Sequence, residues 1–436
     1  MAQFFKAKPK SIRLKAITDC TVTQLDHHLH GVVKAGRETY FVADALPGEQ
    51  IKIQPAGKSG PAKLLKRLTD AEQRIVPRCQ FYRDCGGCSV QHLTAQDQRS
   101  FKQTAVASLI SRLSAYEDLP EVEQEADQEW HYRRVSRLST WFDNKQGWLV
   151  GFRQKASKQL TPISECMVLT ERLSCLIVPL QHALRSWPKA VGLGHIDLID
   201  CEPMVVCRIR LTKALASKWV ASLSALAEQL NIALLLVEAD KQQWLRGEQA
   251  FYQLDEQQLK LAFTPGDFIQ VNASMNQKMV NKAIEWLELG SEDVVLDLYS
   301  GIGNFSLAMA QHSKQVIAVE GVAQMSEQLL SNAKLNGLTN ILAYTGDLED
   351  PETAKHWKNV KVSKVLLDPA RAGAKLAISE VAKLSPSTLV YVSCNPATLA
   401  RDAKVLNQAG YKLVKLALID MFAHTEHVET MALFTR

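Results

Sequence analysis

The sequence lacks any apolar run approaching the roughly 20 residues that a helix needs to cross a bilayer. Its first residues, Met-Ala-Gln-Phe-Phe-Lys-Ala-Lys-Pro-Lys, contain no apolar signal core. These absences predict a cytoplasmic protein with no membrane contact, and we expect a monomer. The length of 436 residues predicts two to four domains, at about 150 residues each.

The sequence also lacks a strong excess of one charge, because its net charge is only +5. The charge is nevertheless uneven. Residues 1–100 contain 16 Lys and Arg against 9 Asp and Glu, so the rest of the chain is slightly acidic. A basic segment favours a polyanion such as RNA as partner. A charge run is also common on a solvated surface with no partner.

A disulfide framework is not expected, because the cysteines number nine and disulfides are rare in cytosolic proteins. Three of them, Cys79, Cys85 and Cys88, lie within ten residues, and Gly86 and Gly87 let this segment curl. Three inert buried thiols are an improbable explanation at this density. The segment predicts a site for zinc or for an iron–sulfur cluster, since both are bound by thiolates.

Such a site needs a fourth ligand. We favour Cys166, at the end of Ile163-Ser-Glu-Cys166. The alternatives Cys175, Cys201 and Cys207 lie in apolar surroundings, where a cysteine is usually a small buried hydrophobe. We expect a site that is structural or contacts RNA, because four cysteine ligands leave no open position for redox catalysis.

Short alternating runs separated by Gly, Pro and Asp predict an all-β unit at the N-terminal end. The five predicted strands are 21–25, 31–34, 39–42, 50–54 and 62–68. Five short strands favour a compact barrel of the kind that binds oligonucleotides. Its basic residues could contact phosphates; they are Lys52, Lys58, Lys63, Lys66 and Arg67.

The middle of the chain carries weaker signals. Residues 94–115 predict a helix with Phe101, Ala105, Leu109 and Leu113 on one face, and the acidic stretch 117–129 predicts a loop. Residues 130–134, Trp-His-Tyr-Arg-Arg, suit either stacking on unpaired bases or a sheet core with flanking charges. Alternating helices and strands at 170–260 predict an α+β domain.

A third glycine is missing from the pattern that dominates the C-terminal part, which excludes the G-x-G-x-x-G dinucleotide fingerprint. Val294-Val-Leu-Asp297-Leu-Tyr-Ser-Gly-Ile-Gly-Asn304-Phe reads as a buried strand that enters a glycine turn and then a helix. A second strand ends in Glu320, where an acid can bind ribose hydroxyls. The pattern resembles the S-adenosylmethionine loop of class I methyltransferases.

Polar residues follow several further predicted strands of this α/β fold. Asp347, Asp368 and Cys394 each stand where a strand ends. Ligands of open α/β sheets bind beyond the carboxyl ends of the strands. This coincidence predicts one site, in which Asp347 contacts the adenine amine of a cofactor.

Cys394 precedes a helix-forming segment, and helix N-termini lower thiol pKa values. We therefore expect a nucleophilic thiolate, although a lone cysteine at a tight turn is more often just a small residue. Glu429 begins the last predicted strand and could act as a general base. His424 and His427 are expected to pack or to form hydrogen bonds rather than to bind metal.

The chain resembles the bacterial RNA uracil-C5 methyltransferases. The matching motifs are Phe-Ile-Gln270-Val-Asn, Asp297-Leu-Tyr-Ser-Gly-Ile-Gly-Asn304-Phe, Asp368-Pro-Ala-Arg-Ala-Gly, Ser-Cys394-Asn-Pro-Ala-Thr-Leu-Ala-Arg-Asp and His427-Val-Glu429. The barrel and the cysteines extend the match and indicate the 23S ribosomal RNA branch. Two positions depart mildly from the family pattern: Ala370 replaces a proline, and Tyr299-Ser300 replaces Phe-Cys.

The resemblance implies a class I, Rossmann-like methyltransferase domain (93–124 and 264–436), a TRAM barrel (10–70) and a central α+β domain (71–92 and 125–263). It implies S-adenosylmethionine as cofactor and 23S ribosomal RNA as partner. Cys394 would attack uracil C6 and Glu429 would remove the C5 proton. The implied cofactor contacts are Gln270, Tyr299, Asn304, Glu320, Asp347 and Asp368. The implied 4Fe-4S cluster is held by Cys79, Cys85, Cys88 and Cys166.

Two rival functions are less favoured. RNA cytosine-C5 methyltransferases share the thiolate chemistry, but they usually carry a second cysteine after the Asp-Pro strand, where Arg371 stands here. An RNA-binding barrel on a catalytically inactive α/β domain is the other rival. Transfer of a labelled methyl group to unmodified RNA separates these possibilities.

Overall fold

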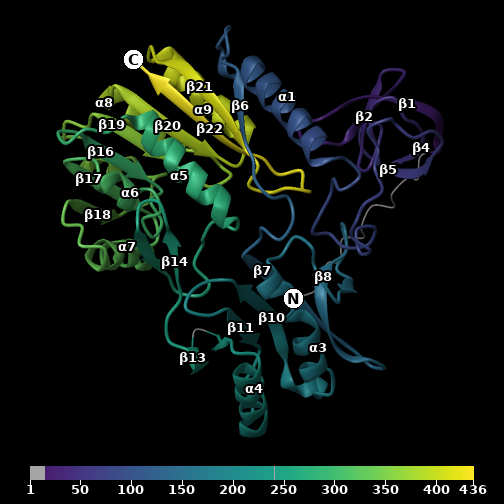
Figure 1. Cartoon of the computed structure of the whole chain (residues 1–436). Helices are drawn as coiled ribbons and strands as arrows, with labels where there is room; N and C mark the ends of the chain where they lie inside the picture. The colour runs from purple at the N-terminus through teal and green to yellow at the C-terminus, as the bar shows by residue number, and fades with distance from the viewer. Residues whose placement is uncertain (1–14, 240) are drawn as a thin grey trace, which may run out of the picture.

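The computed structural model describes residues 15–239 and 241–436. A small barrel, a central sheet domain and a larger α/β domain surround a common centre (Figure 1). Residues 10–14 of the expected barrel domain lie outside the described residues. Within the described part of the chain, no helix is both long enough and apolar enough to cross a membrane.

The N-terminal strands close into a barrel in the order β1-β2-β3-β5-β4. Alternate residues point inward, and Val22, Val33, Val42, Ile51 and Ile53 form its core. The five strands predicted from the sequence are therefore confirmed. Their bounds are β1 (Ile17–Leu25), β2 (Gly31–Ala35), β3 (Glu38–Val42), β4 (Gln50–Pro55) and β5 (Gly60–Arg67).

The central domain is built on a seven-stranded sheet in the order β13-β12-β11-β10-β7-β8-β9. The helices α3 (Ile177–Arg185) and α4 (Ser217–Gln229) pack their apolar faces on it, as the α+β prediction requires. The strands are β7 (Val135–Asp143), β8 (Gly147–Arg153), β9 (Leu160–Pro162), β10 (Leu193–Ile199), β11 (Val206–Leu211), β12 (Ala233–Glu238) and β13 (Lys241–Arg246).

The α/β domain contains an eight-stranded sheet in the order β18-β17-β16-β19-β20-β22-β21-β6. Five neighbouring strands are parallel, and β22 (Glu429–Thr435) runs antiparallel to β20. This is the Rossmann-like sheet that was predicted, buried on both faces by helices. The other strands are β16 (Val294–Leu298), β17 (Gln315–Glu320), β18 (Ile341–Thr345), β19 (Lys364–Leu367), β20 (Thr388–Ser393) and β21 (Lys412–Ile419).

The predicted acidic loop contains a strand that the sequence pattern did not reveal. β6 (Val122–Glu125) pairs in parallel with β21 at the edge of the sheet (Figure 1). Its sequence, Val-Glu-Gln-Glu, has no apolar alternation. The strand is held in the sheet by backbone pairing with β21. Lys282 bridges Glu123 and Glu125 at 2.7 and 2.9 Å. The prediction of a loop was therefore wrong at these four residues.

Helix α1 (Ala95–Ser114) forms as predicted, but of the four residues expected on its buried face only Leu109 is buried. Leu113 is 40% exposed, whereas Gln98 and Lys102 are each 1% exposed. The apolar contacts come from Val106 and Ile110, which pack with the α/β core. Helix α1 lies beside α9 (Pro396–Gln408), far away in sequence (Figure 1). The apolar pattern was misleading because Gln98 and Lys102 are polar and yet buried.

Candidate active site

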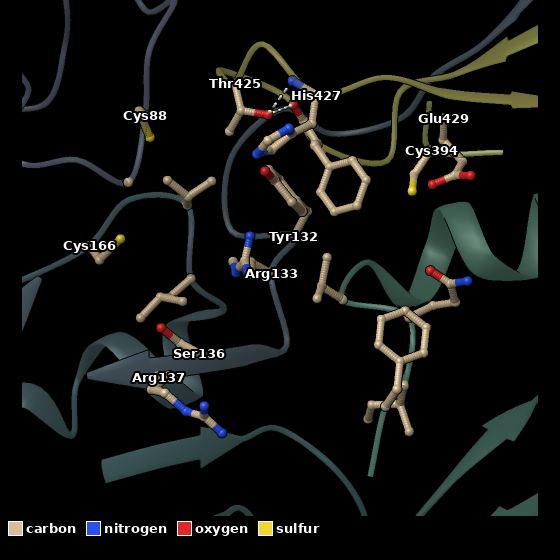
Figure 2. Close-up of a pocket in the computed structure, with 18 of the residues that line it drawn as sticks. Cys88, Tyr132, Arg133, Ser136, Arg137, Cys166, Cys394, Thr425, His427 and Glu429 are labelled. Atoms are coloured by element: carbon tan, nitrogen blue, oxygen red, sulfur yellow. Dashed lines mark hydrogen bonds between the residues drawn. The ribbon is translucent and has the colours of Figure 1, made fainter. Parts of the chain in front are cut away.

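A cavity of about 860 Å³ lies where the carboxyl ends of the parallel strands face the cysteine segment. Figure 2 shows Cys394 and Glu429 on one side of this cavity and Cys88 and Cys166 on the other. Most of the predicted site residues line it. They are Gln270, Tyr299, Asn304, Glu320, Asp368, Cys394, Glu429, Cys79, Cys85, Cys88 and Cys166.

The glycine turn after β16 has an unusual backbone. Tyr299 has a φ of 65°, Gly301 of 55° and Gly303 of 99°, so three residues occupy the left-handed region. A Cβ on Gly303 would lie 2.2 Å from a Leu307 methyl carbon, so a side chain is excluded there. The turn therefore brings the backbone to the edge of the cavity, as the sequence indicated.

Glu320 braces this turn. Its carboxylate accepts hydrogen bonds from Gly301 N–H and Val322 N–H, both at 3.0 Å. The Tyr299 hydroxyl and the Ser300 Oγ are buried without a hydrogen-bond partner among the described residues. Buried polar groups are normally satisfied, so these two atoms indicate that a polar ligand belongs beside the turn.

Asn304 belongs to a network that the sequence analysis missed. Tyr252 OH donates to Asn304 Oδ1 at 2.9 Å, and Asn304 and Asn276 exchange amide hydrogen bonds at 2.9 Å. Arg134 stacks on the Tyr252 ring at 4.3 Å and donates to the Gln270 carbonyl at 2.8 Å. These partners come from three distant segments, so no local motif could have indicated them.

Two aspartates predicted at strand ends behave differently. Asp347 is exposed, caps the Glu349 N–H at 2.9 Å and does not line the cavity. Asp297 is buried and accepts a hydrogen bond from Ser306 Oγ. Burial is the main cause that raises the pKa of Asp297 to about 7. Asp297 therefore stabilises the start of α6 (Ser306–Ala310) beneath the turn.

Cys394 stands between β20 and α9, and its thiol lies next to the Glu429 carboxyl group (Figure 2). Burial, then Glu429 and then Asp368 raise the pKa of Cys394 to about 11, against a smaller lowering effect of Arg371. The expected low pKa is therefore wrong for the free protein. The sequence argument considered only the helix N-terminus, whereas the fold adds two carboxyl groups from β19 and β22.

The two carboxyl groups are themselves perturbed. Glu429 is 4% exposed, and burial followed by repulsion from Asp368 raises its pKa well above the ordinary value. Burial also raises the pKa of Asp368. A thiol and two carboxyl groups with raised pKa values thus share one corner of the cavity. Such clusters are characteristic of sites that transfer protons.

The four predicted metal ligands line the opposite part of the cavity, and burial raises the pKa of each thiol. For Cys88 the value reaches about 12, because the other three cysteines add to the effect of burial. Among the described residues, no three His, Cys, Asp or Glu side chains form a group that could hold one metal ion. A compact zinc site is therefore not assembled.

The aromatic segment 130–134 is mainly structural. Tyr132 and Arg134 are buried, and Tyr132 OH donates to the Ala423 carbonyl at 2.9 Å. Trp130 stacks on His424 with 3.8 Å between ring centroids. Within this segment, Tyr132 and Arg133 line the cavity. His424 forms hydrogen bonds, as expected.

The sequence is similar to those of known proteins. Residues 95–436 match the model of the tRNA (uracil-5-)-methyltransferase family. The chain is 43% identical over 443 residues to "23S rRNA (uracil(1939)-C(5))-methyltransferase RlmD" of Shewanella sediminis, covering 100% of this chain and 99% of that protein. It is 44% identical to the protein of the same name from Aeromonas hydrophila, with 100% of each covered.

A solved structure agrees in fold. The Pyrococcus abyssi tRNA (uracil-54, C5)-methyltransferase, in complex with S-adenosyl-L-homocysteine, superimposes with a TM-score of 0.76. The match covers 96% of this chain and 99% of that one at 21% identity, which is evidence for the fold alone. The family model covers most of the chain, and the bacterial relatives extend over its whole length. The chain therefore belongs to the tRNA (uracil-5-)-methyltransferase family and is an enzyme of that family.

Proposed function

We propose that this enzyme methylates C5 of a uridine in 23S ribosomal RNA, with S-adenosylmethionine as methyl donor. The observation that carries the proposal is the Cys394 thiol beside the Glu429 carboxyl group in the cavity that the glycine turn borders. The names of the full-length bacterial relatives support 23S rRNA as the substrate, and specifically the uridine in their names, position 1939.

The turn after β16 fits S-adenosylmethionine. The unpartnered Tyr299 hydroxyl and Ser300 Oγ can bind its polar groups, and Glu320 stands at the end of β17, where ribose hydroxyls bind. Gln270, Asn304 and Asp368 also face this space. When bound, the cofactor supplies an electrophilic methyl group. Asp347, which lies outside the cavity, has the weakest support as a cofactor contact.

The chemistry follows from the electron demand of uracil. Its C5 is a poor nucleophile until sulfur adds to C6. In the proposed mechanism the Cys394 sulfur forms a bond to C6, and the ring electrons move towards C5 and O4. C5 then accepts the methyl group. Glu429 removes the C5 proton, the C5–C6 double bond re-forms, and the bond between C6 and sulfur breaks.

The two carboxyl groups that help to raise the thiol pKa can also accept its proton. Cys394 must lose a proton before or during attack, and Asp368 and Glu429 are the two carboxyl groups that act on its pKa. Two carboxyl groups can hold two protons, so the thiol proton and the C5 proton do not compete for one base. The target uridine must leave its base stack to reach this corner.

We also propose that Cys79, Cys85, Cys88 and Cys166 hold a 4Fe-4S cluster. All four cysteines line the cavity, and neighbouring cysteines help to raise the pKa of Cys85, Cys88 and Cys166. A cluster accepts thiolates that are spaced too widely for a single ion. The cluster would stabilise the charge on all four sulfurs.

The barrel is proposed to bind RNA phosphates. Lys52 of β4 lies directly opposite Lys66 of β5 in the register of the barrel, and Gln54 lies opposite Lys63. Like charges placed directly opposite each other destabilise a sheet. A bound polyanion would offset this cost. Arg67, in contrast, is already engaged by Asp70 at 2.5 Å.

The test is transfer of a labelled methyl group from S-adenosylmethionine to unmodified 23S rRNA, followed by mass mapping of the product. The expected result is one 5-methyluridine. Label in a cytosine would favour the cytosine-C5 rival, and absence of label with intact RNA binding would favour an inactive RNA-binding protein. Either result would overturn the proposal.

A further inference from the structure

The turn between β21 and β22, residues 420–428, carries His427 and leads directly into Glu429. We propose that Gln98 and Ser89 are positioning residues that hold this turn, and thereby keep the Glu429 carboxylate at the place where it removes the C5 proton. The inference rests on the proposed function, because it concerns one step of that reaction. Neither residue lines the cavity.

Gln98 of α1 is 1% exposed and contacts the turn with both ends of its amide. The His424 N–H donates to Gln98 Oε1 at 2.9 Å, and Gln98 Nε2 lies 3.2 Å from His424 Nδ1. The same Nε2 donates to the Leu93 and Val90 carbonyls at 2.9 and 3.1 Å. The buried Gln98 amide thus connects the turn at 420–428 with residues 90–93, which follow the cysteines.

Ser89 makes the second connection from the cysteine segment. Its N–H donates to the His424 carbonyl at 2.9 Å, and its Oγ accepts from the Glu426 N–H at 2.9 Å. Ser89 directly follows Cys88, so a change in the conformation of the cysteine segment can reach the turn through one residue. Glu426 is three residues from Glu429, which leaves little chain to absorb a displacement.

Other contacts hold the turn at its beginning. Lys102 Nζ donates to Asp420 Oδ1 and to the Phe422 carbonyl, both at 3.3 Å, and Tyr132 OH donates to the Ala423 carbonyl at 2.9 Å. The turn has little internal bonding; Thr425 Oγ1 donates to the Phe422 carbonyl and accepts from the His427 N–H at 3.3 Å. Its shape therefore depends on neighbours.

The geometry matters because a base must lie within about 3 Å of the proton it removes, and a misplacement of about 1 Å can cost roughly 100-fold in rate. The Glu429 carboxyl group lies beside the Cys394 thiol (Figure 2), at the point where the turn enters β22. Loss of the Gln98 or Ser89 contacts would slow proton removal. Attack by Cys394, which stands on β20, would continue, and the covalent enzyme–RNA adduct would accumulate.

The test compares Gln98→Leu with Gln103→Leu. Gln103 is on the same helix and donates to the Val122 carbonyl at 2.6 Å, but it does not contact the turn. Gln98→Leu is expected to lower kcat for methylation about 100-fold, leave the KM for S-adenosylmethionine within about twofold, and accumulate an RNA adduct on a denaturing gel. Gln103→Leu is expected to accumulate none. Equal behaviour of the two variants overturns the inference.

Ser89→Ala and Ser89→Thr provide a second pair, in case Gln98→Leu does not fold. Threonine keeps the hydroxyl that accepts from Glu426, so Ser89→Thr should restore turnover while Ser89→Ala accumulates adduct. Adduct from neither variant counts against the inference. Failure of the proposed function looks different: the unaltered enzyme would then transfer no methyl group, and Glu429→Gln would trap no adduct.

Discussion

Thiols occur on two sides of one cavity, and the two sides are built differently (Figure 2). Cys394 lies between the central strand β20 and the start of α9, where the Asn395 side chain accepts a hydrogen bond from the Ala397 N–H. Cys79, Cys85 and Cys88 lie on a segment without regular helix or strand. Regular elements give the first side a defined geometry, whereas the second side would gain a further constraint from the proposed metal cluster.

The difference predicts which side carries the chemistry. The Cys394 side combines a thiol with two carboxyl groups, which can form and break bonds. On the four-cysteine side, burial is the main cause that raises the pKa of each thiol, and neighbouring cysteines add to it for Cys85, Cys88 and Cys166. We therefore expect substitutions on the first side to change reaction steps, and substitutions on the second side to change order and binding.

The largest effect is expected for Cys394→Ala. In the proposed mechanism the sulfur activates uracil C5, so methylation should fall by a factor on the order of 10⁴ to 10⁶. S-adenosylmethionine binding, measured by calorimetry, should stay within about twofold, since the glycine turn and Glu320 are untouched. Turnover close to that of the unaltered enzyme would remove Cys394 from the mechanism and with it the contrast between the two sides.

Glu429→Gln should lower turnover about 10²- to 10⁴-fold, the usual contribution of a general base. The substitution keeps the side-chain shape but removes the proton acceptor after methyl transfer. A covalent complex with RNA should therefore appear on a denaturing gel, and it should be absent in the double variant Cys394→Ala, Glu429→Gln. A slow enzyme that forms no complex would assign proton removal to another group, with Asp368 the nearest candidate.

Cys88→Ser tests the other side. We expect the proposed cluster to give the purified protein visible absorbance and Cys88→Ser to abolish it; methylation should fall about tenfold, because outer supports of a site typically contribute 10- to 100-fold. Cys175→Ser is the matched control, since Cys175 is an exposed free thiol that does not line the cavity. If Cys88→Ser lost activity as completely as Cys394→Ala, the cysteine segment would have a direct part in the reaction.

The sequence predicted the groups at the strand ends better than the residues that support them, for a physical reason. Parallel strands all end at one edge of their sheet, so Glu320, Asp368 and Cys394 could be placed together from strand ends alone. The supports of the site come from elsewhere in the chain. Tyr252, for example, comes from β14 (Phe251–Leu254), and a local pattern carries no information about such a contact.

Two further failures have the same origin. Edge strand β6 was predicted as a loop because its residues are polar and its stability comes from pairing with β21, almost 300 residues later in the chain. The pKa of Cys394 was predicted in the wrong direction because Glu429 and Asp368 approach the thiol only in the folded sheet. Local sequence determines what ends a strand, whereas the fold determines which charges surround it.

The smallest expected effect concerns the carboxyl groups around Cys394. Below its pKa of about 11, the thiolate fraction of Cys394 rises about tenfold per pH unit, so alkylation by iodoacetamide should rise with the same slope from pH 7 to 10. Removing the like charge of Glu429 lowers the thiol pKa, so Glu429→Gln should be alkylated about three- to tenfold faster at pH 9. Cys394→Ala gives the background from the other thiols. Equal rates with and without Glu429 would mean that the Glu429 charge does not raise the pKa of Cys394, and the electrostatic difference between the two sides of the cavity would lose its support.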